Sequence, residues 1–181
     1  MSKNVCIYCG SRTPKDDALQ DLAIGIGQTL AHNGWGLVFG GGKVGMMGLA
    51  ADAALEAGGN VIGIIPTALK RVEVVHTGLT ELHETPDMHS RKALMERMSD
   101  AFVVLPGGFG TLDEFFEILT WRQLGFHTKP IILINAEGYF DGLIQYVNKA
   151  IDEDFIRENN LDLFTVVSTL DEATEALKTH L

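Results

Sequence analysis

The chain has 181 residues, of which 46% are hydrophobic and 21% are charged, as in an ordinary soluble globular protein. Its 14 basic and 24 acidic side chains give a formal net charge of −10, which argues against broad binding to nucleic acid or to an anionic membrane. That charge still allows a small positive pocket for one phosphate. No apolar run approaches the roughly 18 residues that span a bilayer, and the first residues do not resemble a signal peptide. We therefore expect a cytoplasmic protein.

Apolar runs that resemble buried strands alternate with segments of helical periodicity along the chain. We expect strands at residues 5–10, 35–42, 60–66, 79–84, 101–106, 129–135 and 163–168. We expect helices at residues 16–34, 45–59, 87–100, 111–125, 139–153 and 170–180. Strands without strict apolar–polar alternation are typical of parallel sheets that are covered on both faces. The sequence therefore predicts an α/β fold, a Rossmann-like three-layer sandwich with a central parallel sheet of about seven strands, as one nucleotide-binding domain over residues 1–181.

Two cysteines, Cys6 and Cys9, form a C-x-x-C pair. Redox and zinc sites with this spacing lie at turns or helix starts, and a zinc site needs further ligands. Here the pair lies in or beside a strand, where residues three apart point to opposite faces. We therefore expect two buried structural cysteines.

Three glycine-bearing segments follow predicted strands, at residues 9–12, 40–45 and 106–111. Ligands of Rossmann-like folds bind beyond the carboxyl ends of the strands, so the three together predict a cleft. The segment GGGKVG (40–45) matches G-x-G-x-x-G, but the next strand ends in IGIIP, without the acidic residue that holds a ribose in NAD sites. It also lacks the Walker pattern, because Val44 follows Lys43. We expect it to serve helix packing or another ligand.

The segment PGGFGT (106–111) carries three glycines between a predicted strand and a predicted helix. Gly107, Gly108 and Gly110 permit positive φ and allow a ligand to approach the main chain. Thr111 is expected to cap the helix that follows. Backbone amides and the positive end of the helix dipole would then converge on one small volume, which suits a phosphate. A tight turn alone would need fewer glycines.

Charged side chains flank this loop on both sides in the sequence. Asp113 and Glu114 are adjacent, so on a helix they point about 100° apart and cannot act together as an acid–base pair. An acid near a helix start often only compensates the dipole. Arg91 and Lys92 lie near the start of another helix, where the dipole disfavours cations, so they either bind an anion or are simply solvated. The apolar face of that helix is expected to consist of Ala93, Leu94, Met98 and Met95.

The segments DMHSRKALM (87–95) and LPGGFGTLDEFFEILTWRQLG (105–125) together resemble the Lonely Guy family of cytokinin-activating enzymes. These are nucleoside 5′-monophosphate phosphoribohydrolases that are often labelled lysine decarboxylases. The family pattern pairs M-H-x-R-K with P-G-G-x-G-T-x-x-E, here with Arg91 and Glu114 at an interval of 114 − 91 = 23 residues. The resemblance extends over essentially the whole chain. Phe109 replaces a common tyrosine and Asp113 a common glutamate, and both changes are mild.

The resemblance implies hydrolysis of the N-glycosidic bond of an adenine-type nucleotide, cytokinin nucleotide or AMP, to free base and ribose 5-phosphate. It implies catalytic roles for Arg91 and Glu114, with an oxocarbenium-like ribosyl centre as in other glycoside hydrolysis. It also implies that the enzyme uses no metal or redox cofactor and forms at least a homodimer, with sites near the subunit interface. The implied substrate contacts are Glu73, Lys92, Gly107, Gly108, Phe109, Gly110, Thr111, Leu112, Asp113 and Thr120.

Two other functions compete with hydrolysis. Molybdenum-cofactor carrier proteins have a similar fold and a comparable glycine loop, and hold a phosphorylated pterin without converting it. The pair Arg91 and Glu114 favours the enzyme, because a carrier has no need of both. A nicotinamide-dependent enzyme is disfavoured by the missing ribose-binding acid. The lysine-decarboxylase label would require a pyridoxal phosphate Schiff base, for which the sequence offers lysines and nothing more.

Overall fold

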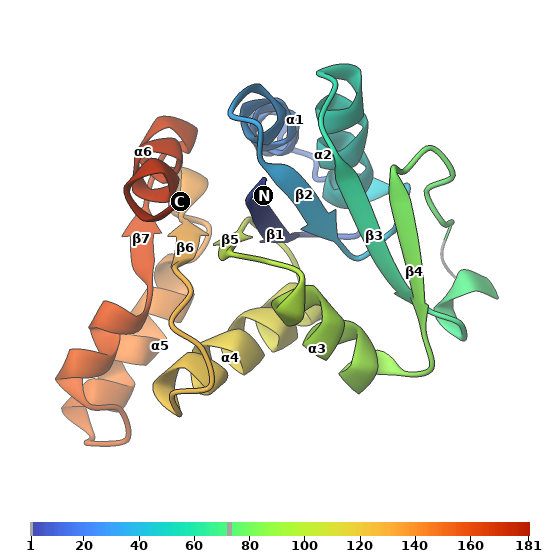
Figure 1. The fold of residues 1–181 in the computed structure, drawn as a ribbon. Coiled ribbons are helices and arrows are strands. Elements are labelled where there is room, and N and C mark those ends of the chain that lie inside the picture. The colour runs from blue at the N-terminus through green and yellow to red at the C-terminus, as the bar shows by residue number, and fades with distance from the viewer. Residues whose placement is uncertain (1, 72–73) are drawn as a thin grey trace.

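The computed structural model describes residues 2–71 and 74–181, and a parallel seven-stranded sheet forms its centre (Figure 1). The strand order is β4-β3-β2-β1-β5-β6-β7, so the prediction of about seven parallel strands is confirmed. The strands are β1 (Asn4–Tyr8), β2 (Gly36–Phe39), β3 (Val61–Pro66), β4 (Glu81–Thr85), β5 (Ala101–Val104), β6 (Ile131–Ile134) and β7 (Thr165–Val167).

Within the described residues, six α-helices cover the two faces of the sheet, and three short 3-10 helices, Leu69–Arg71, Ala136–Gly138 and Glu158–Leu163, lie in the connections. One face carries α1 (Asp17–His32), α2 (Gly45–Glu56) and α6 (Leu170–His180) (Figure 1). The other carries α3 (Met88–Arg97), α4 (Phe109–Gln123) and α5 (Asp141–Asp152). The five inner strands are therefore buried on both faces, which explains their lack of apolar–polar alternation, whereas the edge strands β4 and β7 are largely exposed.

The central strand β1 divides its side chains between two apolar cores. Val5 and Ile7 pack into the core beneath α1 and α2, whereas Cys6 and Tyr8 pack into the core beneath α3 and α4. Cys9 continues the alternation and joins the first core, so the two cysteines lie on opposite faces and both are buried free thiols. Burial raises the pKa of each thiol far above its ordinary value. The expectation of buried structural cysteines is confirmed.

The order of the strands creates a crevice at the centre of the molecule. From β1 the chain continues to β2, β3 and β4 on one side, while β5, β6 and β7 follow on the other side of β1. The loops that leave the carboxyl ends of β1 and β5 therefore turn toward opposite faces of the sheet and leave a space between them. Two of the three glycine-bearing segments, 9–12 and 106–111, begin there.

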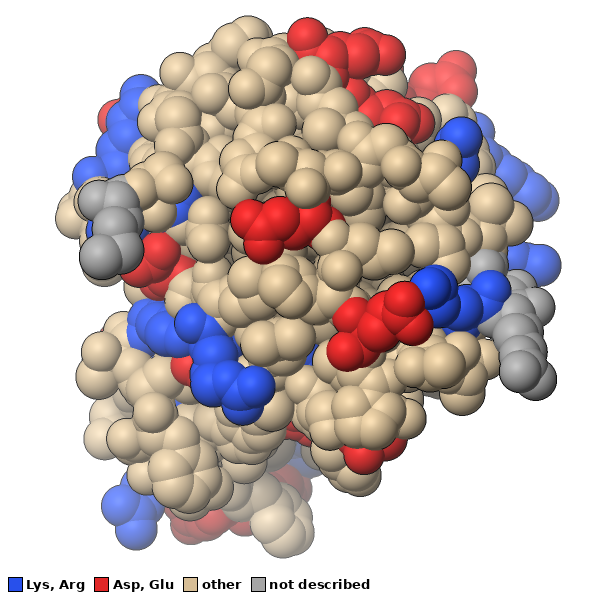
Figure 2. Space-filling model, turned by 45° about the vertical axis from the view of Figure 1, so that its right-hand side comes forward, with Lys and Arg blue, Asp and Glu red and all other residues tan. Residues whose placement is uncertain are grey.

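Charged side chains are mixed on the surface. On the face shown in Figure 2, lysine and arginine gather in small groups beside groups of acidic residues, without a continuous basic area. Within residues 2–71 and 74–181, no helix combines the length and the apolar character needed to cross a membrane.

Candidate active site

A cavity of about 170 Å³ lies at the crevice between the β1 and β5 loops. We call it the Arg91–Glu114 cavity, after the two charged side chains in its wall. Arg91 comes from α3 and Glu114 from α4, the helices that flank β5 in the chain. The remaining lining residues are Cys9, Ser11, Met47, Gly108, Phe109, Gly110 and Thr111.

Arg91 is held in place by backbone carbonyls at the ends of two strands. Its Nε donates to the carbonyl of Ile64 at 3.1 Å, and its Nη2 donates to the carbonyl of Gly40 at 3.2 Å. A Cβ at Gly40 would lie 2.0 Å from Nη2, so only glycine leaves room for the guanidinium there. This explains the glycine that opens GGGKVG, whose expected role in packing is confirmed at that position. The guanidinium is thus fixed by the fold itself.

Glu114 faces Arg91 across the cavity. Its Oε1 lies 3.9 Å from Nη2 of Arg91, and the two side chains are 12% and 7% exposed. A carboxylate and a guanidinium at this separation attract each other strongly in a partly dehydrated cavity. The pair therefore presents one negative and one positive group, held by two different helices, to whatever enters the cavity.

The glycine loop leads into α4 earlier than the sequence suggested. The helix begins at Phe109, and its N-cap is Gly108, which provides no side-chain cap. The prediction that Thr111 is the N-cap is wrong, because Phe109 and Gly110 already have helical conformation. Thr111 instead lies buried in the first turn, where a Cβ on Gly107 would come within 2.0 Å of its Oγ1. An N-cap without a side chain leaves the first-turn amides accessible to a ligand.

None of the three glycines of this loop adopts an unusual backbone angle, and only Gly107 is required by packing within the protein. Among the described residues, the glycines with positive φ do not include Gly107, Gly108 or Gly110, so the loop does not use the conformational freedom that these residues permit. A Cβ built on Gly108 or Gly110 would meet nothing within 4 Å. Both glycines therefore border open space at the positive end of a helix dipole, where an anion is stabilised.

Lys92 is engaged by protein carboxylates. Its Nζ lies 2.6 Å from Glu117 and 3.0 Å from Asp113. Burial alone would lower the pKa of this ammonium, but its hydrogen bonds to Glu117 and Asp113 outweigh burial and raise the pKa overall. In this structure the Lys92 side chain joins α3 to α4. Its predicted contact with a nucleotide, like that of Asp113, stays a prediction.

The other predicted contacts differ in their positions. Phe109 projects from the rim of the Arg91–Glu114 cavity and is 95% exposed. Leu112 packs against the core beneath α3 and α4, and Thr120 lies exposed further along α4. Glu73 falls outside the described residues. The structure thus brings together Arg91, Glu114 and most of the glycine loop around one cavity, whose lining does not include Leu112 or Thr120.

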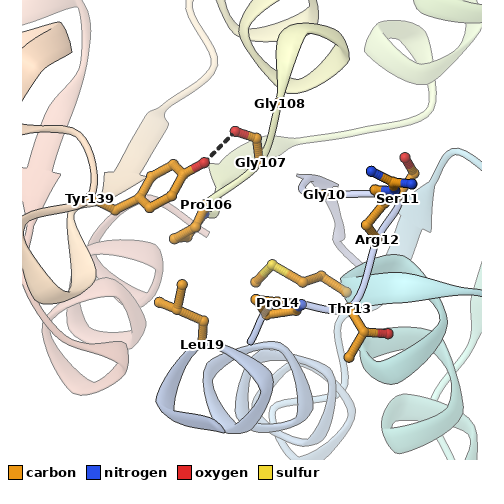
Figure 3. Close-up of a pocket in the computed structure, with 11 residues that line it drawn as sticks. Gly10, Ser11, Arg12, Thr13, Pro14, Leu19, Pro106, Gly107, Gly108 and Tyr139 are labelled. Carbon is orange, nitrogen blue, oxygen red and sulfur yellow. Dashed lines mark hydrogen bonds between the residues drawn. The ribbon is translucent and has the colours of Figure 1, made fainter. Parts of the chain in front are cut away.

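A second cavity, of about 260 Å³, adjoins the first and is more apolar (Figure 3). The two cavities share Ser11 and Gly108. The hydroxyl of Tyr139 donates to the carbonyl of Gly107 at 2.7 Å on this side of the loop (Figure 3). The remaining lining residues are Gly10, Arg12, Thr13, Pro14, Leu19, Met46 and Pro106.

Sequence reasoning missed several residues of this site. Ser11 lies in a segment that the sequence places at the cleft without a role, and Cys9 was expected to be structural only. Met47 and Tyr139 lie in no distinguishing pattern. Their positions depend on which loops meet in space. The part of the chain that the structure describes contains no group of three or more His, Cys, Asp or Glu side chains arranged to hold a metal ion.

Comparison with known proteins identifies the family of this chain. A family model described as possible lysine decarboxylase matches residues 47–177. Cytokinin riboside 5'-monophosphate phosphoribohydrolase LOG5 of Arabidopsis thaliana is 41% identical over 178 residues, which cover 98% of this chain and 78% of that protein. The enzyme of the same name from Rhodococcoides fascians is 43% identical over 177 residues, covering 97% of this chain and 89% of its own.

Solved structures show the same fold. The structural-genomics target TM1055 superposes with a TM-score of 0.74 at 28% identity, and the match covers 99% of both chains. The molybdenum cofactor binding protein of Rippkaea orientalis gives a TM-score of 0.75 at 23% identity, covering 99% of this chain and 97% of the other. At that identity the second similarity establishes the fold alone.

Proposed function

This chain belongs to the family of cytokinin riboside 5'-monophosphate phosphoribohydrolases, and we propose that it hydrolyses the N-glycosidic bond of an N6-modified adenosine 5'-monophosphate, of AMP, or of both. The resemblance to the Lonely Guy family that the paired motifs predicted is confirmed. The observation that carries the proposal is the placement of Arg91 and Glu114, 3.9 Å apart, beside the open amino end of α4. One nucleotide can engage both features at once.

The 5'-phosphate binds at the amino end of α4, where Gly108 and Gly110 leave space beside the backbone amides. The ribose then lies between this loop and the pair of charged side chains. Cleavage breaks the bond between C1' and the base nitrogen, and the base departs with the bonding electrons and takes up a proton. Water adds to C1', so the products are the free base and ribose 5-phosphate.

Glu114 stabilises the positive charge that develops during this reaction, and Arg91 holds the nucleotide. Positive charge grows on the ribosyl ring as the base leaves, and the carboxylate of Glu114 stabilises it electrostatically. Arg91 holds the nucleotide, through either the departing base or the phosphate. Its guanidinium is fixed by Ile64 and Gly40 before the substrate arrives, so little reorganisation is required during the reaction.

A second copy of the chain is part of this proposal, as are nucleotide contacts from Glu73, Lys92, Leu112, Asp113 and Thr120. The carboxyl end of α4 supports the idea of a homodimer, because Leu124 and Phe126 expose large apolar surfaces there. Thr120 lies on the same helix and is also exposed. Such a patch suits contact with another protein surface. A cytoplasmic location also belongs to the proposal.

Lysine decarboxylation is not supported by the lysine beside the site. A Schiff base with pyridoxal phosphate requires a lysine that can reach the neutral amine form. The hydrogen bonds of Lys92 to Glu117 and Asp113 raise its pKa and favour the ammonium form. The family label therefore describes a chemistry that Lys92 is poorly suited to perform.

Product analysis by liquid chromatography tests the proposal. The purified protein is incubated with AMP, isopentenyladenosine monophosphate and the nucleoside isopentenyladenosine. We expect free base from one or both monophosphates and none from the nucleoside, and the ratio of rates identifies the preferred substrate. Binding of the monophosphates without release of base would contradict the proposal and favour a nucleotide-binding or phosphorylated-cofactor carrier.

A further inference from the structure

Tyr139 reaches the phosphate-binding loop from a different part of the sheet. It lies between β6 and α5, whereas the loop lies between β5 and α4. Its hydroxyl donates to the carbonyl oxygen of Gly107 at 2.7 Å, across 32 residues of sequence (Figure 3). The phenol and the carbonyl meet at the wall of the second cavity, outside the Arg91–Glu114 cavity.

The segment that carries Tyr139 is anchored on both sides. Asn135 accepts a hydrogen bond from the amide of Phe140 at 2.6 Å and donates to Asp141 at 2.8 Å. The ring of Phe140 is buried in the core beneath α3 and α4 and meets the Tyr139 ring edge-on, with centroids 5.0 Å apart. These contacts make the turn a rigid support for the phenol.

The backbone of this turn is also unusual. Glu137 and Gly138 both have positive φ, at 52° and 68°. For glutamate this conformation is unfavourable, and such strain persists only where surrounding contacts impose it. The two residues immediately precede Tyr139, so the strained turn determines where the phenol emerges.

The orientation of one peptide group links Tyr139 to the active site. The carbonyl of Gly107 and the N–H of Gly108 belong to the same peptide unit, and the described residues contain no cis peptide bond. In a trans peptide the C=O and the N–H point in opposite directions. A carbonyl fixed toward Tyr139 therefore turns the Gly108 N–H away from Tyr139. Gly108 lines both cavities, whereas Tyr139 lines only the second.

We propose that Tyr139 is a positioning residue for phosphate recognition: by holding the Gly107 carbonyl, it directs the Gly108 N–H into the Arg91–Glu114 cavity, toward the 5'-phosphate. This inference rests on the proposed function. Without the hydroxyl, the Gly107–Gly108 peptide can rotate, because glycine on both sides imposes little barrier. Rotation replaces a donor at the N-cap of α4 with a carbonyl oxygen, which repels an anion.

The variant Tyr139→Phe tests the inference, because it removes the hydroxyl and keeps the ring. The matched control is Tyr146→Phe, which removes a hydroxyl from a solvent-exposed tyrosine on α5. Binding of ribose 5-phosphate and of inorganic phosphate is measured by calorimetry, and kcat and KM are measured with the preferred nucleoside monophosphate. For Tyr139→Phe we expect both phosphate compounds to bind roughly 5- to 10-fold more weakly, the effect of one lost hydrogen bond.

The pattern of kinetic changes separates positioning from general stability. We expect KM to rise by a similar factor while kcat changes less than twofold, and the control to match the native protein in every measurement. Unchanged phosphate binding and KM in Tyr139→Phe would overturn the inference. So would a uniform loss of kcat together with a lower melting temperature and unchanged phosphate binding, because that result indicates a structural role only.

Binding of ribose 5-phosphate also separates this inference from the proposed function. If the native protein cleaves no nucleotide but binds ribose 5-phosphate, and Tyr139→Phe binds it more weakly, the hydrolase proposal fails and the role of Tyr139 is supported. If the native protein cleaves nucleotides and Tyr139→Phe does so with unchanged KM and phosphate affinity, the hydrolase proposal holds and the role of Tyr139 is refuted.

Discussion

Two glycine-rich loops of this protein look alike in sequence and use their glycines differently. In GGGKVG, a Cβ on Gly40 would overlap the guanidinium of Arg91, and a Cβ on Gly45 would lie 2.4 Å from the backbone of Ser11. In PGGFGT, a Cβ on Gly108 or Gly110 would meet no protein atom within 4 Å. The first loop makes room for the protein's own atoms, and the second leaves room beside a helix amino terminus.

This difference suggests how to separate packing glycines from ligand-binding glycines. A glycine that would clash with its own chain is explained by the fold. A helical glycine that borders open space is not explained by packing, and it indicates a ligand where it also lines a cavity, as Gly110 does and Gly142 does not. Gly107 belongs to the first kind, because its Cβ would overlap Thr111 and approach Gly10.

The largest expected effect is the loss of turnover on replacing Glu114 or Arg91, the two charged side chains of the cavity. We expect Glu114→Gln and Arg91→Ala each to lower turnover at least about 100-fold, which corresponds to about 2.7 kcal/mol of barrier. Steady-state kinetics with the nucleoside monophosphate measures the loss, and circular dichroism verifies the fold. A folded Glu114→Gln protein with near-native turnover would remove Glu114 from the mechanism.

Gly40→Ala should give the next largest effect, because it disturbs Arg91 without altering its chemistry. The new methyl group would lie 2.0 Å from Nη2 and force the end of a flexible side chain to move. We expect turnover to fall roughly 10- to 100-fold, as for other small displacements of catalytic groups. The melting temperature should also fall, because the displaced guanidinium loses hydrogen bonds to Ile64 and Gly40. Native kinetics in this variant would show that the guanidinium position is not critical.

Much of the fold was predictable because burial on both faces leaves a clear pattern. The apolar runs of β1, β2, β3, β5 and β6 predicted a parallel sheet, and the glycine-bearing segments at the strand ends predicted a cleft. Capping preferences did not locate the helix start at Phe109, because they rank glycine and threonine alike at the N-cap and do not distinguish Gly108 from Thr111. Thr111 satisfied the usual preference and lies in the first turn instead.

The inward face of α3 was also not predictable from the sequence. Apolar spacing assigned that face to Ala93, Leu94, Met95 and Met98, yet the most buried side chains of the helix are Arg91, Lys92 and Met95. A cation can be buried when strand carbonyls or carboxylates surround its charged end. Those partners, such as Gly40 for Arg91 and Glu117 for Lys92, lie far away in the sequence. Tyr139 was not predicted either, because its partner Gly107 also lies far away in the sequence.

Lys92→Met tests whether the second cation of α3 belongs to packing or to the ligand. The substitution leaves Glu117 and Asp113 without their shared partner, so we expect a loss of about 1.5–3 kcal/mol in unfolding free energy. Urea unfolding at pH 7 measures this loss. Lys178→Met, which removes an exposed helix ion pair, is the control and should cost less than about 0.5 kcal/mol. A raised KM with unchanged stability would assign Lys92 to the nucleotide instead.

The stability difference between the native protein and Lys92→Met should also depend on pH. The pKa of Lys92 is raised in the folded protein, because its hydrogen bonds to Glu117 and Asp113 outweigh the effect of burial. Its contribution to stability is therefore complete below the ordinary value of 10.5 and is lost as pH rises through the higher folded value. We expect the stability difference between native protein and Lys92→Met to be constant from pH 7 to about 9.5 and to shrink above 10.5. A difference that grows with pH would contradict the ion-pair arrangement.

Gly110→Ala has the smallest expected effect on the free energy of unfolding. The substitution should stabilise the protein while weakening substrate binding, which tests the comparison of the two loops directly. Gly110 is the second residue of α4, and Gly142 is the second residue of α5; a Cβ at either would meet nothing within 4 Å. Replacing either by alanine should stabilise the protein by about 0.4–1 kcal/mol, since alanine loses less conformational entropy on folding. Thermal unfolding measures this gain.

The two alanine variants should differ only when the nucleotide is present. At Gly110 the added methyl group occupies the space assigned to the phosphate, so we expect KM to rise roughly fivefold or more, which corresponds to about 1 kcal/mol of steric overlap. At Gly142 we expect native KM. A loop that evolved for packing would give two variants with equal kinetics, because neither methyl group touches the protein. A more stable protein that binds its substrate less well, at one helix start and not at the other, is what a glycine retained for a ligand predicts.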